Sequence, residues 1–372
     1  MIEERGVKLE IEEEKEPTKD SEVFYNSEMV RNRDISIAAL QTYNSRKKNL
    51  RILDALSGSG IRALRYAKEV GHAKKVTAND LKPEAYENIQ KNAKINGLDL
   101  ETTNQDANAL MSSRRKEYDF IDIDPFGSPL KFADSAVRSI DYEGFAGFTA
   151  TDLAPLCGTY KKTCMRRYGS KPYSTSYCHE LGLRILMKSL FEAFARFDKV
   201  FRPKISFAQK HYYRVLGELR ETKKGVNRML DSIGYLKHCK ECGFREMVEG
   251  FDSKECKECG GDLEIIGPLW IGKLGREDFA EDSLEKLEEK EYTESAELLQ
   301  KCKREYKIKK PYYDTHNLAS ILKVQVPRLE DLIEKLRDKG YQAELTHFSD
   351  TGIRTYCPIS DLKSVIREVS GS

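Results

Sequence analysis

Short apolar runs alternate with amphipathic stretches from residue 49 onward, and this alternation restricts the fold more than any other feature. The runs have the length of strands and the amphipathic stretches that of helices; the first of them are NLRILDAL, GIRALRYAKEV, KKVTAND and KPEAYENIQKNAKING. Strands that alternate with helices in this way form a mostly parallel sheet covered on both faces. We therefore predict an α/β, doubly wound domain over residues 49–235.

The length of 372 residues allows two or three domains, because a domain usually has about 100 to 200 residues. We expect an N-terminal segment over 1–48, a cysteine-rich insert with its return strand over 236–275, and a C-terminal domain over 276–372. The stretch EDFAEDSLEKLEEKEYTESAELL is expected to be helical, acidic and solvated. After it, two or three helices and a short hairpin follow in an order that resembles a winged-helix module.

Composition restricts the compartment. No run approaches the ~18 apolar residues of a membrane span, and the amino terminus has no apolar segment typical of a signal peptide. We therefore expect a cytoplasmic protein. Its nine cysteines are then metal ligands or free thiols, since that compartment keeps thiols reduced.

The segment LDALSGSGIRALRYA has the pattern of a strand, a small-residue loop and a helix. The apolar run reaches Asp54, the loop contains Gly58 and Gly60, and the helix starts near Ile61. Glycines let the backbone approach a ligand closely, and the free amides of a helix start favour an anionic group. Because similar loops occur in many nucleotide enzymes and in proteins without a ligand, this segment alone leaves both possibilities open.

Two acids follow the next two predicted strands, Asp80 in TANDLKPEA and Asp106 in NQDAN. In an open α/β sheet, ligands lie beyond the carboxyl ends of the strands, where a carboxylate can accept both ribose hydroxyls. We assign that role to Asp80, and expect Asp106 to accept from an adenine amino group, with Ala107 leaving room for the ring. In the alternative, each acid only caps the following helix.

The loop sequence distinguishes between nucleotide ligands. GSGIR is not the dinucleotide fingerprint, and no Lys-Ser/Thr pair follows it to form a phosphate loop. A nucleoside that carries a carboxylate, such as S-adenosylmethionine, fits better than NAD or ATP.

The segment DFIDIDPFGSP ends a hydrophobic run in an acid, a proline and an aromatic ring. An exocyclic amine of a base is a poor nucleophile because its lone pair is conjugated with the ring. Asp124 and the carbonyl of Pro125 could accept its hydrogens, while Phe126 stacks on the base, and proline fixes the turn that aims them. This is the physical counterpart of the Asp/Asn-Pro-Pro-aromatic motif of amino methyltransferases, with the aromatic ring one place earlier.

Four cysteines form two CxxCG units separated by thirteen residues: Cys239, Cys242, Cys256 and Cys259. Four thiolates at this spacing suit tetrahedral zinc, and the following glycines permit the tight turns. A site closed by four thiolates leaves no position for substrate, so we predict a structural zinc ion. The other cysteines show no such spacing, and we interpret them as packing residues.

The chain resembles the tRNA guanine-26 N(2)-dimethyltransferase family over nearly its whole length. The motifs that carry the resemblance are VFYNSEMVRNRDI, ALSGSGIRALR, IDPFGSP, TATDLAPLCGTYKKTCMRRY, GPLWIGKL and THFSDTGIRT. The resemblance implies a class I, S-adenosylmethionine-dependent methyltransferase domain that converts a guanine of tRNA to its monomethyl and then its dimethyl form. It further implies that Phe24 and Phe126 flank the methyl-transfer pocket and that Arg33 and Arg62 contact the cofactor.

Two other functions fit parts of the pattern. The acid-proline-aromatic motif could serve methylation of adenine in DNA, and the cysteine units could belong to a non-catalytic zinc-dependent RNA-binding protein. The basic, tyrosine-containing stretches YKKTCMRRYGSKPYS and LLQKCKREYKIKKPYY are either solvated helix faces or contacts to RNA phosphates. If the chain binds tRNA, these basic stretches are expected to contact its phosphates. The sequence says nothing about protein partners.

Overall fold

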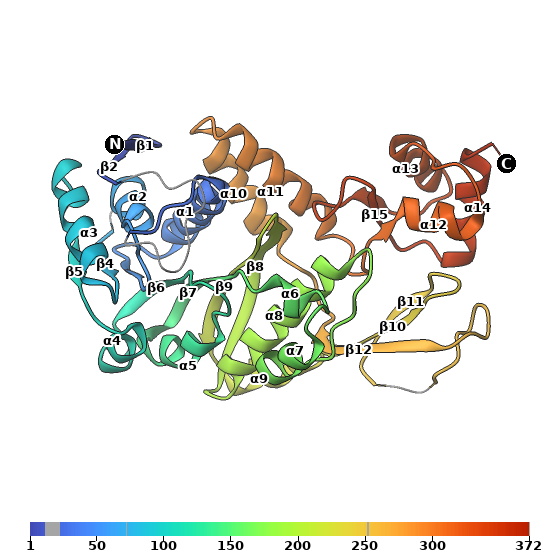
Figure 1. The fold of residues 1–372 in the computed structure, drawn as a ribbon, viewed down its shortest axis with the longest axis horizontal. Helices are drawn as coiled ribbons and strands as arrows, with labels where there is room; N and C mark the ends of the chain where they lie inside the picture. Colours follow the sequence, from blue (N-terminus) through green and yellow to red (C-terminus); the bar gives the residue numbers. More distant parts are fainter. Residues whose placement is uncertain (12–22, 72, 251–252, 372) are drawn as a thin grey trace.

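The structure is a computed structural model that describes residues 1–11, 23–71, 73–250 and 253–371 (Figure 1). At its centre is a seven-stranded sheet in the order β5-β4-β3-β6-β7-β9-β8. Its strands are β3 (Arg51–Asp54), β4 (Lys75–Asn79), β5 (Glu101–Thr103), β6 (Tyr118–Ile123), β7 (Ile140–Ala150), β8 (Lys199–Gln209) and β9 (Tyr212–Glu221). Five neighbouring strands, β3 to β7, pair in parallel, and β9 runs antiparallel to both of its neighbours. The predicted mostly parallel α/β sheet is confirmed.

Strand order reverses at β3, which pairs with β4 on one side and with β6 on the other. At such a switch point the following loops diverge to opposite faces, and a crevice opens beyond the carboxyl ends of the strands. All residues of β6 are buried, which explains why its sequence is a continuous hydrophobic run apart from acids with internal partners.

Helices cover both faces of the sheet (Figure 1). One face carries α1 (Val30–Arg46), α2 (Ile61–Glu69) and α3 (Pro83–Ile95). The other carries α4 (Ala107–Ser113), α5 (Leu130–Ser139) and α8 (Cys178–Ala195). Three short helices, α6 (Leu153–Leu156), α7 (Lys161–Tyr168) and α9 (Lys223–Leu230), flank α8 and β8. Ahead of α1 lie the hairpin β1 (Ile2–Glu4) and β2 (Val7–Leu9) and a 3-10 turn η1 (Ser27–Met29).

The acidic stretch after residue 276 forms two helices, α10 (Glu277–Glu288) and α11 (Thr293–Glu305). It is only partly solvated, because Phe279, Leu284 and Leu299 are buried in the larger core. These helices pack against α1 and β8 (Figure 1). Their apolar positions recur at helical spacing, so the acids face solvent while one side of each helix covers the sheet domain.

The cysteine-rich insert forms a second, antiparallel sheet in the order β11-β10-β12. Its strands are β10 (Ile233–Cys239), β11 (Arg245–Val248) and β12 (Leu263–Trp270). The C-terminal part contains β13 (Tyr313–Asp314), α12 (Thr315–Leu322), α13 (Leu329–Asp338), β14 (Ala343–Leu345), β15 (Gly352–Thr355) and α14 (Ile359–Val369). Two helices between a strand and a hairpin agree with the predicted winged-helix-like order. The cysteine knuckle and these helices share one smaller core.

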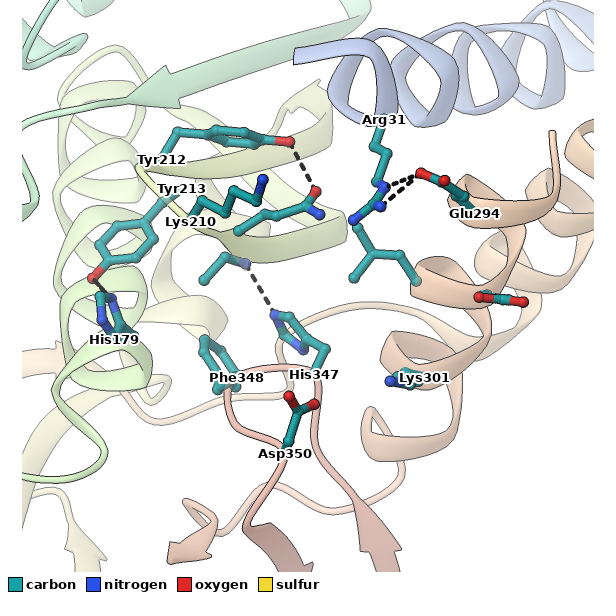
Figure 2. A pocket seen from close by; sticks show the side chains of 14 residues that line it. Arg31, His179, Lys210, Tyr212, Tyr213, Glu294, Lys301, His347, Phe348 and Asp350 are labelled. Atoms are coloured by element: carbon teal, nitrogen blue, oxygen red, sulfur yellow. Dashed lines mark hydrogen bonds and ion pairs between the residues drawn. The ribbon is translucent and has the colours of Figure 1, made fainter. Parts of the chain in front are cut away.

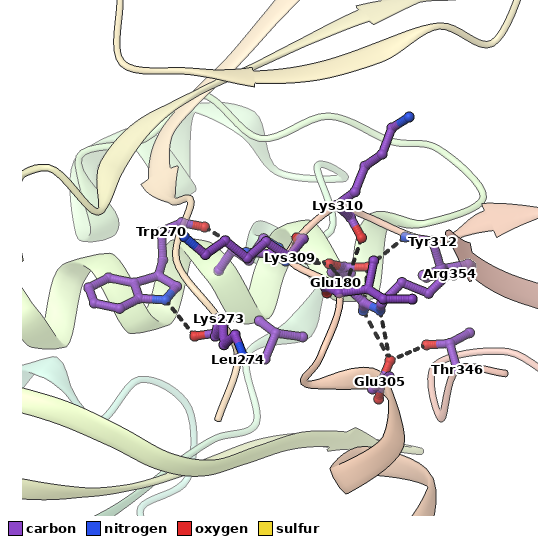
Figure 3. Close-up of polar contacts among 12 residues, drawn as sticks. Glu180, Trp270, Lys273, Leu274, Glu305, Lys309, Lys310, Tyr312, Thr346 and Arg354 are labelled. Atoms are coloured by element: carbon purple, nitrogen blue, oxygen red, sulfur yellow. Dashed lines mark hydrogen bonds and ion pairs between the residues drawn. The ribbon is translucent and has the colours of Figure 1, made fainter. Parts of the chain in front are cut away.

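A buried ionic network joins α8 to this C-terminal part (Figure 3). The guanidinium of Arg354 on β15 contacts both carboxylate oxygens of Glu180 at 2.9 Å and Glu305 on α11 at 3.0 Å. Glu180 also accepts from Arg184 at 2.8 Å. All four of these side chains have no exposed surface. Two positive and two negative groups are thus desolvated together.

Among the helices that the structure describes, none is long and apolar enough to cross a lipid bilayer.

Candidate active site

A cavity of about 500 Å³ lies beyond the carboxyl ends of β3, β4 and β6. Its lining brings together six residues predicted from the sequence: Phe24, Gly58, Asp80, Asp124, Pro125 and Phe126. They come from the segment before α1 and from the loops that follow the three strands. This volume is within the range typical of small-molecule sites.

Asp80 holds the glycine loop against the end of β4. One of its carboxylate oxygens accepts from the amide of Gly58 at 2.8 Å, and the other accepts from the amide of Lys82 at 3.0 Å. Each oxygen has a further lone pair for a ligand hydroxyl. Gly58 has φ of +54°, and a Cβ there would lie 2.9 Å from the carbonyl oxygen of Phe24. Glycine is therefore required both by the backbone conformation and by the close approach of the two segments.

Asp106 and Ala107 do not line this cavity. Asp106 is the N-cap of α4 and accepts from the amide of Ala109 at 3.0 Å, which is the contact expected of a simple helix cap. Its carboxylate is exposed, so the second oxygen can still meet a ligand at the edge of the sheet. The adenine contact of Asp106 stays a prediction.

Beneath the cavity lies a group of buried charges. Arg62 is ion-paired with Asp124 and lies 3.4 Å from Asp122. Arg214 on β9 contacts both oxygens of Asp122, at 2.7 and 2.8 Å. Burial alone would raise the pKa of Asp122, but the two guanidinium groups hold it below its usual range. Arg62 does not line the cavity; through its ion pair, it fixes the Asp124 carboxylate at the cavity wall.

In this group of buried charges, Asp54 is the carboxyl whose negative charge is not fully offset by a neighbouring arginine. Burial, followed by the charge of Asp122, raises the pKa of Asp54 to about 7. Its Oδ2 is buried and has no hydrogen-bond partner. An orphaned buried carboxylate oxygen costs free energy, so a cationic group of a ligand would complete the cluster. Gly60, at the start of α2, has φ of +80°, which favours glycine, and a Cβ there would make a tight contact of 3.1 Å with the Ile89 side chain.

The two predicted aromatic rings touch each other. The centroids of Phe24 and Phe126 are 4.6 Å apart with an interplanar angle of 78°. The arrangement is edge to face, so no slot between parallel rings is present. Phe126 is 47% exposed, so it is not an ordinary core aromatic and can offer one face to a base.

Arg33 lies behind the cavity wall. Its guanidinium is buried and ion-paired with Glu4, and it donates to the carbonyl of Asn26 at 3.0 Å. Asn26 lines the cavity, whereas Arg33 does not. Arg33 therefore anchors the segment that carries Phe24, and its predicted cofactor contact stays a prediction.

The β8–β9 turn contributes cavity residues that no local sequence pattern had indicated. Lys210, His211 and Tyr212 line the cavity, as does Thr151 after β7. Tyr212 is 3% exposed, and burial raises its pKa, so its hydroxyl stays protonated. The cluster KHYY between two apolar runs was the available signal, but only the sheet order places this turn beside β6.

A second cavity, of about 470 Å³, adjoins the first at Lys210 and Tyr212 (Figure 2). It lies between the β8–β9 hairpin, α11 and the loop before β15. Arg31 is bound to Glu294 across its upper side, and the amide of Ala208 donates to His347 at 2.9 Å. The hairpin thus has a cavity on each side, one toward the sheet and one toward the C-terminal part.

The four knuckle cysteines converge as predicted. Their sulfur atoms all lie within 4.8 Å of one another, and the pairs Cys239–Cys259 and Cys242–Cys256 are 3.6 and 3.5 Å apart. Tetrahedral zinc with Zn–S bonds of about 2.3 Å requires S···S distances of about 3.8 Å. The glycines that follow, Gly243 and Gly260, have φ of +77° and +75°. Both the donor set and the turns therefore fit a zinc ion.

Comparison with known proteins identifies similar chains. The family model described as N2,N2-dimethylguanosine tRNA methyltransferase matches residues 6–367. The tRNA (guanine(26)-N(2))-dimethyltransferase of Methanobrevibacter smithii is 38% identical, over 100% of this chain and 98% of that protein. The protein of that name from Methanosarcina barkeri is 39% identical, over 95% and 94%. The structure of Trm1 from Pyrococcus horikoshii with S-adenosyl-L-methionine is similar with a TM-score of 0.84 at 33% identity, covering 94% of this chain and 96% of that one.

Proposed function

The chain belongs to the N2,N2-dimethylguanosine tRNA methyltransferase family, and we propose that it transfers two methyl groups in succession from S-adenosylmethionine to the 2-amino group of guanine 26 in tRNA. It is an S-adenosylmethionine-dependent enzyme that methylates guanine in tRNA. The observation that carries the proposal is the cavity where Asp80 and the glycine loop meet Asp124, Pro125 and Phe126. A single cavity would then hold both the nucleoside cofactor and the guanine amino group that accepts the methyl group.

The cofactor would be held by groups that the structure leaves available. Asp80, on the cavity wall, has free lone pairs for the ribose hydroxyls. Asp54 is 1% exposed and does not line the cavity; its orphaned oxygen would attract the cationic amino group from behind the wall. The amides of residues 57–60 already donate to Asn79, Asp80, Phe24 and Ser57, so the carboxylate would be bound by the first amides of α2. S-adenosylmethionine, when bound, supplies the electrophilic methyl group.

The target guanine would stack on the exposed face of Phe126, while Phe24 supports that ring edge-on. A base within folded tRNA must leave its stack to be reached, and stacking recovers part of the few kcal/mol that this costs. Asp124, fixed by Arg62, and the carbonyl of Pro125 accept the amine hydrogens. Holding these hydrogens favours a more pyramidal nitrogen, whose lone pair would take the methyl group while the sulfur keeps the electron pair of the broken S–C bond; the amine proton would then pass to water.

The test uses tRNA transcripts that carry guanine or adenine at position 26, with duplex DNA as a third substrate. We expect radiolabel from the cofactor only in the guanine transcript, and digestion should yield monomethyl and then dimethyl guanosine. Transfer to DNA adenine would instead support the alternative amino methyltransferase. Absence of cofactor binding by calorimetry would support a non-catalytic RNA-binding protein.

Asp80→Ala should weaken cofactor binding about 10- to 100-fold, because about 1.5–3 kcal/mol of hydrogen bonding to a charged group is lost. Titration calorimetry with S-adenosylmethionine measures this. Asp80→Asn is the matched control, since it keeps one acceptor oxygen and should lose less. Unchanged affinity in the alanine variant would contradict the ribose assignment.

Cofactor affinity should rise with pH through about 7, the value to which burial and the charge of Asp122 raise the pKa of Asp54. The carboxyl is neutral below this pH, and only its ionised form attracts the cationic amino group. Binding should therefore strengthen by up to about tenfold per pH unit until Asp54 is ionised. Calorimetry over this range on the parent and on Asp54→Asn checks the assignment, because the variant should show a flat profile. Equal slopes in both proteins would contradict it.

We propose that the four knuckle cysteines bind a structural zinc ion, on the strength of their donor set and spacing. Cys256→Ser should release this ion without removing the cofactor cavity, which lies in the other core. Metal analysis of the purified protein and calorimetry with the cofactor measure the two properties. Cys164→Ala is the control, because this thiol is buried in the larger core and should leave zinc unchanged.

We propose that the tRNA contacts include α7. Lys161, Lys162 and Arg166 are exposed on it, beside the exposed ring of Tyr160. Phosphate contacts of this kind would give a steep salt dependence of tRNA affinity. The C-terminal part, which packs on the knuckle, is proposed to add further RNA contacts.

A further inference from the structure

A second group of metal-ligand side chains lies at the start of α8, outside the cavity and the knuckle. Cys157 follows α6, while Cys178 and His179 begin α8. The Sγ of Cys157 is 3.5 Å from Nδ1 of His179, and one donor atom from each of the three residues lies within 4.8 Å of the others. The hydroxyl of Tyr213 on β9 is 3.1 Å from Cys157 Sγ and 3.1 Å from His179 Nδ1.

The distance between Cys157 and His179 matches that of a coordination sphere, while the Tyr213 hydroxyl, at 3.1 Å from both, lies closer than a bound fourth ligand would. A tetrahedral ion with a sulfur ligand at about 2.3 Å and a nitrogen ligand at about 2.0 Å separates the two donors by about 3.5 Å. The corresponding distances in the knuckle are 3.6 and 3.5 Å. In both groups all donor atoms lie within 4.8 Å of one another, although the sequence spacing of the second group gives no sign of it.

The fold provides room for the phenol. A Cβ at Gly182 would lie 2.7 Å from the Tyr213 hydroxyl, so a glycine one turn after Cys178 lets the ring reach α8. A hydrogen bond from Tyr213 to His179 is enough to explain how the buried Tyr213 hydroxyl is satisfied. It does not explain why the thiols of Cys157 and Cys178 also gather within 4.8 Å of this histidine, because thiols are weak hydrogen-bond partners.

The group is also accessible. Cys157, Cys178 and His179 are each partly exposed, and His179 lies at the edge of the second cavity beside Tyr213 (Figure 2). An ion from solvent can therefore reach it, unlike a fully buried thiol cluster.

We propose that Cys157, Cys178 and His179 bind a second metal ion of the zinc type, with the Tyr213 hydroxyl at the fourth position. On binding, the two thiols release their protons to solvent, and the thiolates and the neutral imidazole donate electron pairs to the ion. The ion would cross-link α6, α8 and β9. Two of these elements continue from the cavity wall, since Thr151 precedes α6 and Tyr212 precedes Tyr213.

The test loads the full-length reduced protein with Zn²⁺, removes excess ion by desalting and counts zinc per chain. We expect two equivalents in the parent and a loss of one in Cys178→Ser and in His179→Ala. Cys256→Ser should lose the other equivalent, and Cys164→Ala, a neighbouring buried thiol, should keep both. Substitution with Co²⁺ should give a thiolate charge-transfer band that decreases in each cluster variant.

Thermal unfolding gives a second readout if one variant folds poorly. Added Zn²⁺ should raise the melting temperature of Cys256→Ser, whose second site is intact, and that increase should disappear when Cys178→Ser is added. A single equivalent in the parent, abolished by Cys256→Ser and untouched by Cys178→Ser, would overturn the proposal. A Cys157–Cys178 disulfide in the freshly purified protein, detected by thiol titration with and without reductant, would also overturn it. No arm uses tRNA or cofactor, so failure here is distinct from failure of the proposed methyl transfer.

Discussion

Phe126→Ala is expected to lower methyl transfer to tRNA by about 10- to 100-fold, because stacking of a base on an aromatic ring contributes about 1–3 kcal/mol. The exposed face of this ring is the surface on which the extruded guanine would lie. Phe24→Ala should act in the same direction, since its ring supports Phe126 at 4.6 Å. Initial rates with saturating cofactor and a guanine-26 transcript measure the effect.

Cofactor affinity should be nearly unchanged in both variants. The Phe24 carbonyl accepts from the amide of Ser59 at 3.0 Å, and this backbone contact to the glycine loop survives the substitution. Tyr142→Ala is the matched control, because Tyr142 is 53% exposed near the amino end of β7, away from the cavity. Parent rates in both phenylalanine variants would refute the stacking surface.

Arg354→Ala is expected to lower the free energy of unfolding by about 3–5 kcal/mol, because removing one partner of a buried network leaves uncompensated charge. Glu180 and Glu305 would both lose their contact to the guanidinium (Figure 3). Since these acids lie on α8 and α11, the C-terminal part should become more susceptible to protease. Chemical denaturation and limited proteolysis measure the two effects.

Arg276→Ala is the control for this prediction. Arg276 forms an ion pair with Asp278, and both side chains are more than half exposed. Such surface pairs contribute about 0–1 kcal/mol, so this variant should resemble the parent. Equal stability of the two alanine variants would show that the network does not hold the C-terminal part in place.

Most of the fold could be predicted from short sequence patterns. The boundaries of β3, β4 and α2, the glycine loop and the CxxCG turns were readable, because each depends on a short periodicity or on a backbone conformation that favours glycine. The same local logic identified Asp80 and Asp124 at strand ends. It was less informative for Asp106, where a helix cap and a ligand contact require the same residue type.

For the acidic stretch after residue 276, the local sequence pattern predicted the helices but not their burial. Its composition suggested a solvated segment, yet Phe279 and Leu284 cover the sheet domain. Charged residues dominate the average, whereas burial depends on a few apolar positions on one side of each helix. Which surface those positions cover is decided by packing with α1.

The sequence by itself determined the α/β class, the position of the glycine loop, the acid-proline-aromatic strand end and the two CxxCG turns, because each of these is set by residues that lie close together in the chain. Only the tertiary structure decided that Tyr212 closes the cavity, that Arg62 fixes Asp124, and that Cys157 meets Cys178 and His179. Those contacts join segments from about 20 to about 190 residues apart in the chain. Their partners are chosen by strand order and helix packing, which no local pattern specifies.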